Sequence, residues 1–241
     1  PRSTPKPSSA ASDVYKRQRQ EKKPLPQGIP LIKVVERKLK LPKPSPRGSL
    51  SLEEAIEKRR SEREFSPQSL SLREISQILW AAQGVSGAGG FGRTCPSAGA
   101  LYPLEIYVEV RKTEGLEPGV YNYDVFQHAL ELTSRGDCSQ ELADACLSQL
   151  FIAEAPVVFL IAAEYGRVTW KYGERGLRYV YLEAGHCCQN ICLQVTALGL
   201  SAVPVGAFWD RQVQRVLALP QDVEPVYLVP VGRSPIRRRP E

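Results

Sequence analysis

The stretch GLRYVYLEAGHCCQNICLQVTAL at residues 176–198 is apolar or small nearly all round a helical wheel, and Gly199 follows it as a typical helix stop. A helix with so little polar surface needs cover on most sides, so we expect it at the centre of the domain. The run PVVFLIAA at residues 156–163 is continuously apolar and predicts a strand that is buried on both faces. A long helix packed on a buried strand is therefore the expected core.

Two capping boxes, each a serine followed three residues later by a glutamate, predict helices that begin after Ser51 and Ser71. We expect ordered structure to start at the first of these helices, whose apolar face is formed by Leu52, Ala55 and Ile56. The second helix continues to Gly84, which is placed to stop it.

The remaining pattern alternates strands and helices without a regular repeat. Residues 104–110 alternate apolar and polar side chains, which predicts a strand with one buried face. Further strands are expected at 120–123, 129–133, 202–207 and 225–231, and further helices at 137–153 and from Asp210. This order predicts the α+β class, with a central, mostly antiparallel sheet flanked by helices.

The distribution of charge argues against a nucleic-acid-binding domain. The chain of 241 residues carries a net charge of +6, but residues 1–48 hold 13 basic and three acidic residues. Without that +10, and the +2 of residues 237–241, residues 49–236 carry −6. Phosphate recognition needs a basic face on the folded unit, so no nucleic-acid partner is expected. No apolar run approaches the ~20 residues of a membrane span, so none is expected.

The ends of the chain differ in composition from its middle. Residues 19–48 are basic and rich in proline, which is typical of a linker or arm. Residues 8–18, SSAASDVYKRQ, match the translation of a common sequencing-library adaptor, so residues 1–18 are interpreted as an artefact. We expect one folded domain over residues 49–236 and a basic tail at 237–241.

The chain contains no methionine, even at residue 1, so we expect a fragment or a processed product from which any targeting signal farther upstream would have been lost. A cytoplasmic location is expected. The six cysteines lack the paired spacing of a zinc site, so we expect reduced thiols and no metal. His186 has no carboxylate four residues on, and we expect it to be a buried core residue.

Two short motifs could carry chemistry. Residues 59–63, RRSER, offer guanidinium groups and a hydroxyl, a donor set suited to a phosphate. A solvated helix end is the alternative, because basic side chains also complement the dipole at a helix C-terminus. Residues 96–103, PSAGALYP, place small residues between two prolines, which lets backbone approach a flat ligand closely.

These motifs stand in order with GVYNY at 119–123, KYGERGLRY at 171–179, EAGHCCQN at 183–190, ALGL at 197–200, VGAF at 205–208 and PVGR at 230–233. The ordered set, over residues 51–234, resembles the nitroreductase superfamily of FMN-dependent oxidoreductases. The ALYP sequence is similar to the SagB-type azoline dehydrogenases, which oxidise thiazoline and oxazoline rings in modified peptides. Simpler nitroreductases usually follow Pro-Ser with Asn and Gln-Pro, which are absent here. The resemblance implies a nitroreductase-like fold and a homodimer.

The resemblance also implies an FMN site and its residues. The basic cluster would bind the phosphate, the ribityl chain and the pyrimidine edge, through Arg59, Arg60, Ser61 and Arg63. The opposite subunit would contribute Pro96, Ser97 and Ala98, because the family builds its flavin site across a dimer interface. The backbone near Gly206 and Ala207 would face flavin N5. Arg233 would supply a second fork for the phosphate.

Lys171 and Tyr172 are the candidate catalytic residues. In the azoline dehydrogenase branch, a Lys-Tyr pair at this motif is linked to base chemistry on the heterocycle. A lysine whose pKa is lowered by burial or by nearby Arg175 could remove the ring proton while hydride passes to N5. The alternative is that Lys171 is a solvated loop residue and Tyr172 a packing residue.

Three hypotheses of function follow. The first is an FMN enzyme that transfers a hydride between its substrate and flavin N5, with an azoline in a peptide as the substrate. The second is a nitroreductase or quinone reductase of the same fold with NAD(P)H as electron donor. The third is a non-catalytic module that binds flavin or a peptide, although the intact RRSER, KYG and PVGR motifs argue against it. The expected partners are a second copy of the chain and a small-molecule or peptide substrate.

Overall fold

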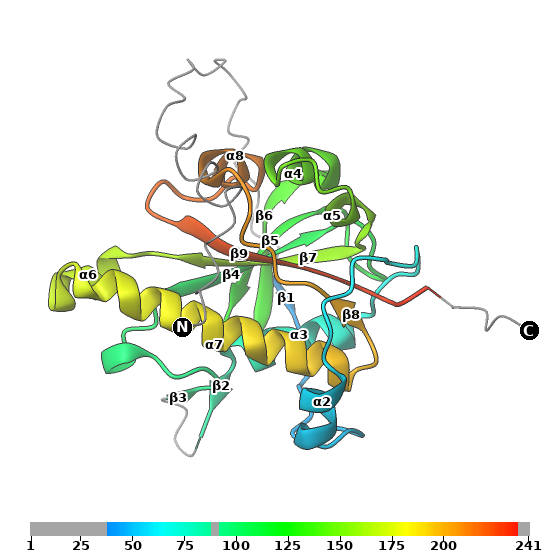
Figure 1. Ribbon diagram of the computed structural model, residues 1–241, viewed down its shortest axis with the longest axis horizontal. Coiled ribbons are helices and arrows are strands. Elements are labelled where there is room, and N and C mark those ends of the chain that lie inside the picture. Colours follow the sequence, from blue (N-terminus) through cyan, green and yellow to red (C-terminus); the bar gives the residue numbers. More distant parts are fainter. Residues whose placement is uncertain (1–37, 88–91, 236–241) are drawn as a thin grey trace, which may run out of the picture. The chain divides into compact units, whose positions relative to one another are not determined.

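The computed structural model describes residues 38–87 and 92–235 (Figure 1). Seven strands form one sheet in the order β1-β6-β5-β4-β7-β9-β8, and every neighbouring pair is antiparallel. The strands are β1 (Lys38–Lys40), β4 (Leu104–Val110), β5 (Gly119–Asp124), β6 (Ala129–Arg135), β7 (Val157–Ala163), β8 (Ser201–Ala202) and β9 (Glu224–Gly232). A separate hairpin consists of β2 (Val85–Ser86) and β3 (Gly92–Arg93). The expected α+β class with an antiparallel central sheet is confirmed.

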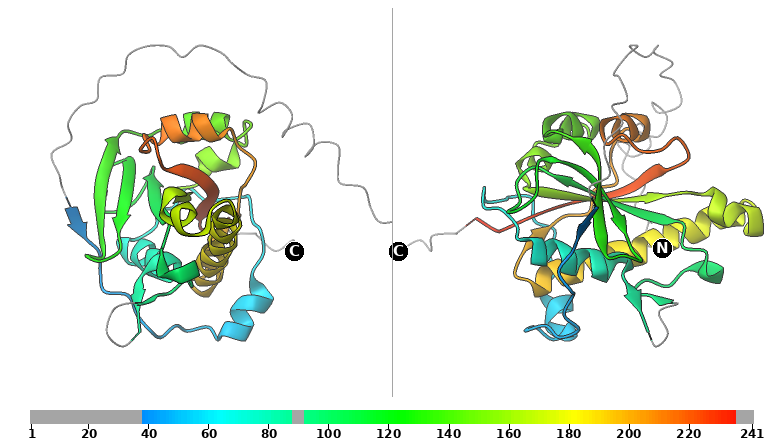
Figure 2. Two further views of the ribbon diagram at one scale, coloured as in Figure 1. Left: turned by 90° about the vertical axis from the view of Figure 1, so that its left-hand side faces the viewer. Right: turned by 180° about the vertical axis from the view of Figure 1, so that it is seen from behind.

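Helices cover both faces of this sheet, as Figure 2 shows. On one face lie α2 (Leu52–Lys58), α3 (Leu72–Gln83), α6 (Gly166–Tyr172) and α7 (Arg175–Ala197). On the other lie α4 (Ser139–Ala145), α5 (Phe151–Glu154) and α8 (Asp210–Val216). The long helix α7 begins and ends within one residue of its expected bounds, so that prediction is confirmed.

Strand β7 shows how the two layers share the sheet. Val157, Phe159 and Ile161 belong to the core beneath α3 and α7, whereas Val158 and Leu160 belong to the core beneath α4, α5 and α8. Because side chains alternate across a strand, a continuously apolar run packs against both layers at once. The predicted burial of this strand on both faces is confirmed.

Strand β4 is buried on both faces, and the prediction of a single buried face is wrong. Tyr107 and Glu109, which alternate with the apolar positions, are both buried. Tyr107 belongs to the core beneath α4 and α5. The alternation predicted one solvent-facing side of the strand, but the helices α4 and α5 cover that side as well.

Both predicted capping boxes are present. The Ser51 hydroxyl accepts a hydrogen bond from the backbone of Glu54, and Ser71 does the same for Glu74. The expected apolar face of α2 does not become core, however. Ala55 is buried, but Leu52 and Ile56 are 61% and 56% exposed.

The single helix expected over residues 137–153 is wrong, because the chain forms the two short helices α4 and α5. Between them Leu147 and Ser148 adopt left-handed backbone conformations, with φ of 61° and 57°. These conformations end one helix and redirect the chain into the next. Residues 137–153 contain neither Gly nor Pro, so the usual sequence signals of a break are missing.

Two other boundaries differ from expectation. The strand expected over 202–207 reduces to β8. Val203 and Val205 still donate to the carbonyls of Pro230 and Leu228 on β9, but Pro230 has no N–H with which to return a bond to Val203. At the other edge, residues 38–40 form β1 on β6, and Leu41 is buried. Ordered structure therefore begins before Ser51, within the segment expected to be a linker; residues 1–37 and 236–241 lie outside the described part of the chain.

His186 is exposed on α7, so the expectation of a buried core histidine is wrong. Its position falls on the stripe of α7 that faces away from the sheet. Among residues 38–87 and 92–235, we find no helix with the length and apolar content that crossing a membrane requires.

Candidate functional site

The basic segment 59–66 runs beside the end of the sheet. The backbone N–H of Glu62 donates to the carbonyl of Ala202 at 3.0 Å, and Ser66 donates to the carbonyl of Arg233 at 2.8 Å. Ser61 pairs with Ala202 as a parallel bridge. The structure therefore brings the RRSER and PVGR motifs together, as a shared ligand would require.

The arginines of this segment have different surroundings. Arg60 donates to the carbonyls of Glu57 at 2.7 Å and Arg59 at 2.8 Å, so its guanidinium closes the C-terminus of α2. Arg59 is half-buried near Cys192 of α7, and a hydrogen bond from Cys188 together with the charge of Arg59 lowers the pKa of Cys192. The Arg63 guanidinium lies 5.9 Å from the centre of the Phe151 ring.

Arg59 and Arg63 make no ion pair within the described part of the chain, whereas Arg233 does. Its Nη2 lies 3.0 Å and 3.1 Å from the two carboxylate oxygens of Glu74. Glu74 is thus shared between a helix cap and this arginine. A phosphate would have to compete with Glu74 for Arg233, which is not the case at Arg59 or Arg63.

The second motif, PSAGALYP, packs against the predicted catalytic pair in the same chain. Gly99 has φ of 63°, and a Cβ placed on it would lie 2.7 Å from Tyr172 Oη and 3.0 Å from Lys171 Nζ. Ser97 stabilises the turn, because its hydroxyl accepts a hydrogen bond from the Tyr102 N–H at 2.9 Å. The two motifs, more than 60 residues apart in sequence, therefore meet in the fold.

Lys171 and Tyr172 end helix α6. The Lys171 ammonium lies 5.4 Å from the centre of the Tyr172 ring, which packs edge-to-face on Tyr179 of α7 at 5.1 Å. Lys171 is exposed and Tyr172 is half-buried. The burial considered for Lys171 is therefore not found within the described part of the chain.

Glu183 is a site residue that the sequence analysis missed. Its side chain lies on α7, only 2% exposed, near Ser97 and Gln83. Burial raises the pKa of Glu183 to about 7, while Ser97, Gln83 and Arg93 oppose this rise. The available signal was a carboxylate in a nearly apolar helix, four residues after Tyr179 and therefore one turn along the same face.

The candidate residues form two groups at different places along α7. Ser97 lies beside Glu183, whereas Arg59 lies near Cys192. The two α7 positions are nine residues apart, which corresponds to about 13 Å at ~1.5 Å per residue. Within one chain, the PSAGALYP and RRSER motifs therefore lie at two separate places, which we call the two candidate half-sites.

Gly206 and Ala207 lie in the exposed loop between β8 and α8. The carbonyl of Ala207 accepts a hydrogen bond from the Gln149 amide at 3.0 Å. Their N–H groups have no partner among the described residues, so both remain available as donors to a ligand.

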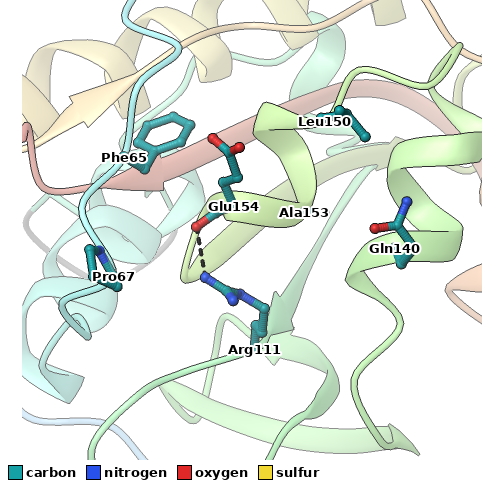
Figure 3. A pocket seen from close by; sticks show the side chains of 7 residues that line it. All are labelled: Phe65, Pro67, Arg111, Gln140, Leu150, Ala153 and Glu154. Carbon is teal, nitrogen blue, oxygen red and sulfur yellow. Dashed lines mark hydrogen bonds between the residues drawn. The ribbon is translucent and has the colours of Figure 1, made fainter.

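Two shallow cavities lie elsewhere. The larger, about 450 Å³, is drawn in Figure 3 between the segment after RRSER and helices α4 and α5. There the Arg111 guanidinium donates to the backbone carbonyl of Glu154 at 2.7 Å. The smaller, about 340 Å³, is lined mainly by polar residues including Glu105, Arg167 and Asp222. Neither is lined by a predicted site residue, so neither marks the site in one chain.

The model of the nitroreductase family matches residues 56–233. “Putative nitroreductase MJ1384” of Methanocaldococcus jannaschii is 50% identical over 185 residues, which cover 77% of this chain and 92% of that protein. The microcin B17-processing protein McbC of Escherichia coli is 29% identical over 63% of this chain, which spans 58% of McbC. The crystal structure of a protein from Ralstonia eutropha JMP134, which is also named a “putative nitroreductase”, has a TM-score of 0.73 to this chain. The two are 30% identical, and the match covers 88% of this chain and 98% of that chain.

Proposed function

The chain belongs to the nitroreductase family, and from this premise we propose that it is an FMN-dependent oxidoreductase that works as a homodimer. The observation that carries the proposal is the pair of half-sites along α7. One holds Arg59, which has no acidic partner among the described residues, and the other offers a flat turn of small residues beside a lysine and a tyrosine.

The residues present fit a flavin phosphate. Arg59 and Arg63 have no acidic partner among the described residues, and the Ser61 hydroxyl is exposed beside them. Such a set presents positive charge and several N–H donors to an anion, which is the chemistry that phosphate binding needs. Arg60 would contribute less to phosphate binding, because its guanidinium already donates to backbone carbonyls at the C-terminus of α2.

FMN, when bound, supplies a hydride acceptor at N5. The free N–H groups of Gly206 and Ala207 would donate a hydrogen bond near that atom. Pro96, Ser97 and Ala98 would hold the ring from the second subunit, since in one chain their half-site stands apart from the arginines. The flavin would determine the redox chemistry, and the protein would determine how the substrate is oriented and whether it reaches the ring.

The exposed surface supports a homodimer. The outward stripe of α7 carries Leu177, Tyr181 and Leu182, which are 41%, 57% and 54% exposed. Large apolar side chains gathered on one helix face mark an interface more often than a solvated surface. A two-fold contact through this stripe would use the same patch on both chains and would bring the second chain close to the half-site at Glu183.

For the substrate, we propose an azoline ring in a peptide. Oxidation of such a ring removes one hydride and one proton, so a base must lie near the ring. Lys171 and Tyr172 are suited to accept and relay the proton, because their polar atoms lie together at Gly99. The likeness to McbC, a protein named for processing microcin B17, supports this choice.

The test of the cofactor is the absorbance spectrum of the purified protein, with the released chromophore identified and counted. We expect about one FMN per chain. A colourless protein that does not take up added FMN would contradict the proposal.

The test of the substrate class uses Lys171→Ala and Tyr172→Phe in two single-turnover measurements. Flavin reduction by an azoline peptide should slow by roughly 10²- to 10⁴-fold, since a general base contributes that much. Flavin reoxidation by a quinone should change little, because solvent can deliver that proton. Lys43→Ala, an exposed lysine at another place, is the control. Unchanged rates in both measurements would remove the assigned roles.

A nitroreductase or quinone reductase that uses NAD(P)H is the second candidate function. The observation that favours it is the higher identity to the Methanocaldococcus protein than to McbC. Rapid flavin reduction by NADH or NADPH, with none by an azoline peptide, would select this alternative.

A further inference from the structure

A buried polar cluster lies beneath the 96–103 segment. Glu183 comes from α7, Gln83 from the end of α3 and Arg93 from β3. Arg93 donates to the Gln83 side-chain oxygen at 3.3 Å. Glu183 and Gln83 are 2% and 0% exposed, so both polar side chains lie in the interior.

This cluster supports the segment at both ends. At its start, the Cys95 thiol donates to the backbone carbonyl of Glu183 at 3.6 Å, and Ser97 is near the Glu183 carboxyl. At its end, the Arg93 guanidinium stacks on the Tyr102 ring at 4.4 Å. The middle of the segment, at Gly99, rests on Lys171 and Tyr172.

The cluster solvates a charge poorly. One carboxylate oxygen of Glu183 and the amide nitrogen of Gln83 are buried without a hydrogen-bond partner. A buried carboxylate with an unpaired oxygen is unfavourable, and the protonated form needs fewer hydrogen-bond donors. The closed arrangement therefore favours neutral Glu183.

We propose that Glu183 is a positioning residue: its protonated form keeps the 96–103 segment packed against Lys171 and Tyr172, and its ionisation releases that segment. The link between the Glu183 proton and the packing of the 96–103 segment depends only on residues of this chain. The consequence for catalysis and for FMN binding rests on the proposed function, in which this segment contacts the flavin of the second subunit.

The opening of the segment depends on pH because Glu183 has different pKa values in the closed and open forms. Burial raises the pKa of Glu183 to about 7 from an ordinary 4.5. If the segment opens and water reaches the carboxyl, its pKa returns toward the ordinary value. The open form then loses its proton at lower pH than the closed form, so opening becomes more favourable as pH rises between these values. The opening equilibrium should increase by roughly 10²-fold and level off above pH ~7.

The other groups that face Glu183 do not titrate in this range. Arg93 on β3 remains a cation, as guanidinium groups do. Burial raises the pKa of the Cys95 thiol to about 12 and also raises that of Cys187 on α7. A change near neutrality in this segment is therefore assigned to Glu183.

Hydrogen exchange of FMN-free protein tests the proposal without any substrate. Protection factors, corrected for intrinsic exchange, are measured from pH 5 to 8.5 for a peptide covering residues 95–103. The wild-type values should fall by roughly 10²-fold toward high pH. Glu183→Gln, which cannot ionise, should keep them constant. Glu109→Gln removes another buried carboxyl, on β4, and should behave as the wild type.

Constant protection in the wild-type protein overturns the proposal, as does an equal fall in Glu183→Gln. The wild-type series requires no variant, so the test stands even if Glu183→Gln fails to fold. FMN titrations over the same range provide the second measurement: affinity should weaken with pH in the wild type and less in Glu183→Gln. If protection falls as expected but FMN does not bind, the positioning role stands and the proposed function fails.

Discussion

Arg59 and Arg60 are neighbours in sequence, but the structure gives their guanidinium groups different surroundings. Arg60 donates to two backbone carbonyls at the end of α2, whereas Arg59 has no acidic partner among the described residues. Arg59→Ala should weaken FMN binding by roughly 10- to 100-fold, since one charge-assisted hydrogen bond contributes about 1.5–3 kcal/mol. Arg60→Ala should leave the affinity within a few-fold. Fluorescence titration with FMN measures both, and equal losses would count against the assignment.

Glu109 should make the free energy of unfolding depend on pH. It is 0% exposed, neither carboxylate oxygen has a partner, and burial together with Asp137 raises its pKa to about 8 against the opposing Arg111. The unfolded chain releases this proton near its ordinary 4.5, so the folded state binds more protons between these values. The free energy of unfolding should therefore fall with rising pH, by up to about 1.4 kcal/mol per pH unit for this group.

Urea denaturation at several pH values checks this dependence. Glu109→Gln should flatten the decline between pH 5 and pH 8, because an amide has no proton to release. Glu141→Gln, exposed on α4, is the matched control and should keep the wild-type slope. Parallel curves for wild type and Glu109→Gln would show that Glu109 is not the group responsible.

At the scale of elements, substitution of Gly99 tests whether the contact between the 96–103 segment and α6 matters for the reaction. Gly99→Ala places a methyl group 2.7 Å from Tyr172 Oη, so the pair must shift. We expect slower oxidation of an azoline peptide, approaching the Lys171→Ala variant, and a loss of stability of about 1–2 kcal/mol from the left-handed backbone.

Gly115→Ala provides a close control for this substitution. Gly115 also has a positive φ, of 80°, but a Cβ there would meet nothing within 4 Å. Thermal unfolding should show a similar loss for both variants, whereas flavin reduction should slow only in Gly99→Ala. Equal rates in the two variants would mean that the contact at Gly99 does not matter for the reaction.

At the scale of the whole molecule, the proposed homodimer would make assembly a condition of flavin binding, because each chain alone would hold the two half-sites apart. Leu182→Glu introduces a charge on the exposed stripe of α7 and should yield monomers that hold little FMN. The Leu150→Glu variant changes a similarly exposed leucine beside α5, and it should remain dimeric and keep the absorbance of bound flavin. Light scattering with absorbance detection measures both properties together. A monomeric Leu182→Glu protein with full FMN would contradict the shared site.

Local patterns in the sequence determined most elements of this fold. Two capping boxes placed α2 and α3, and a continuously apolar run placed β7. Such signals are local, because caps and periodicity act between residues only a few positions apart. The order of motifs was also sufficient to indicate the family, and the candidate residues at 59–63, 96–98 and 171–172 came from it.

Proximity, and burial at several positions, were decided only by the tertiary structure. Leu52 and Ile56 had the spacing of a core face but stay exposed, while Glu109 and Glu183 had polar side chains but are buried. The break between α4 and α5 occurs at residues without a breaker signal. Each of these outcomes depends on which distant segment packs against the residue, and a local pattern has no information about that segment. For the same reason, only the fold could show that Ser97 lies beside Glu183 at one place along α7 and Arg59 at another.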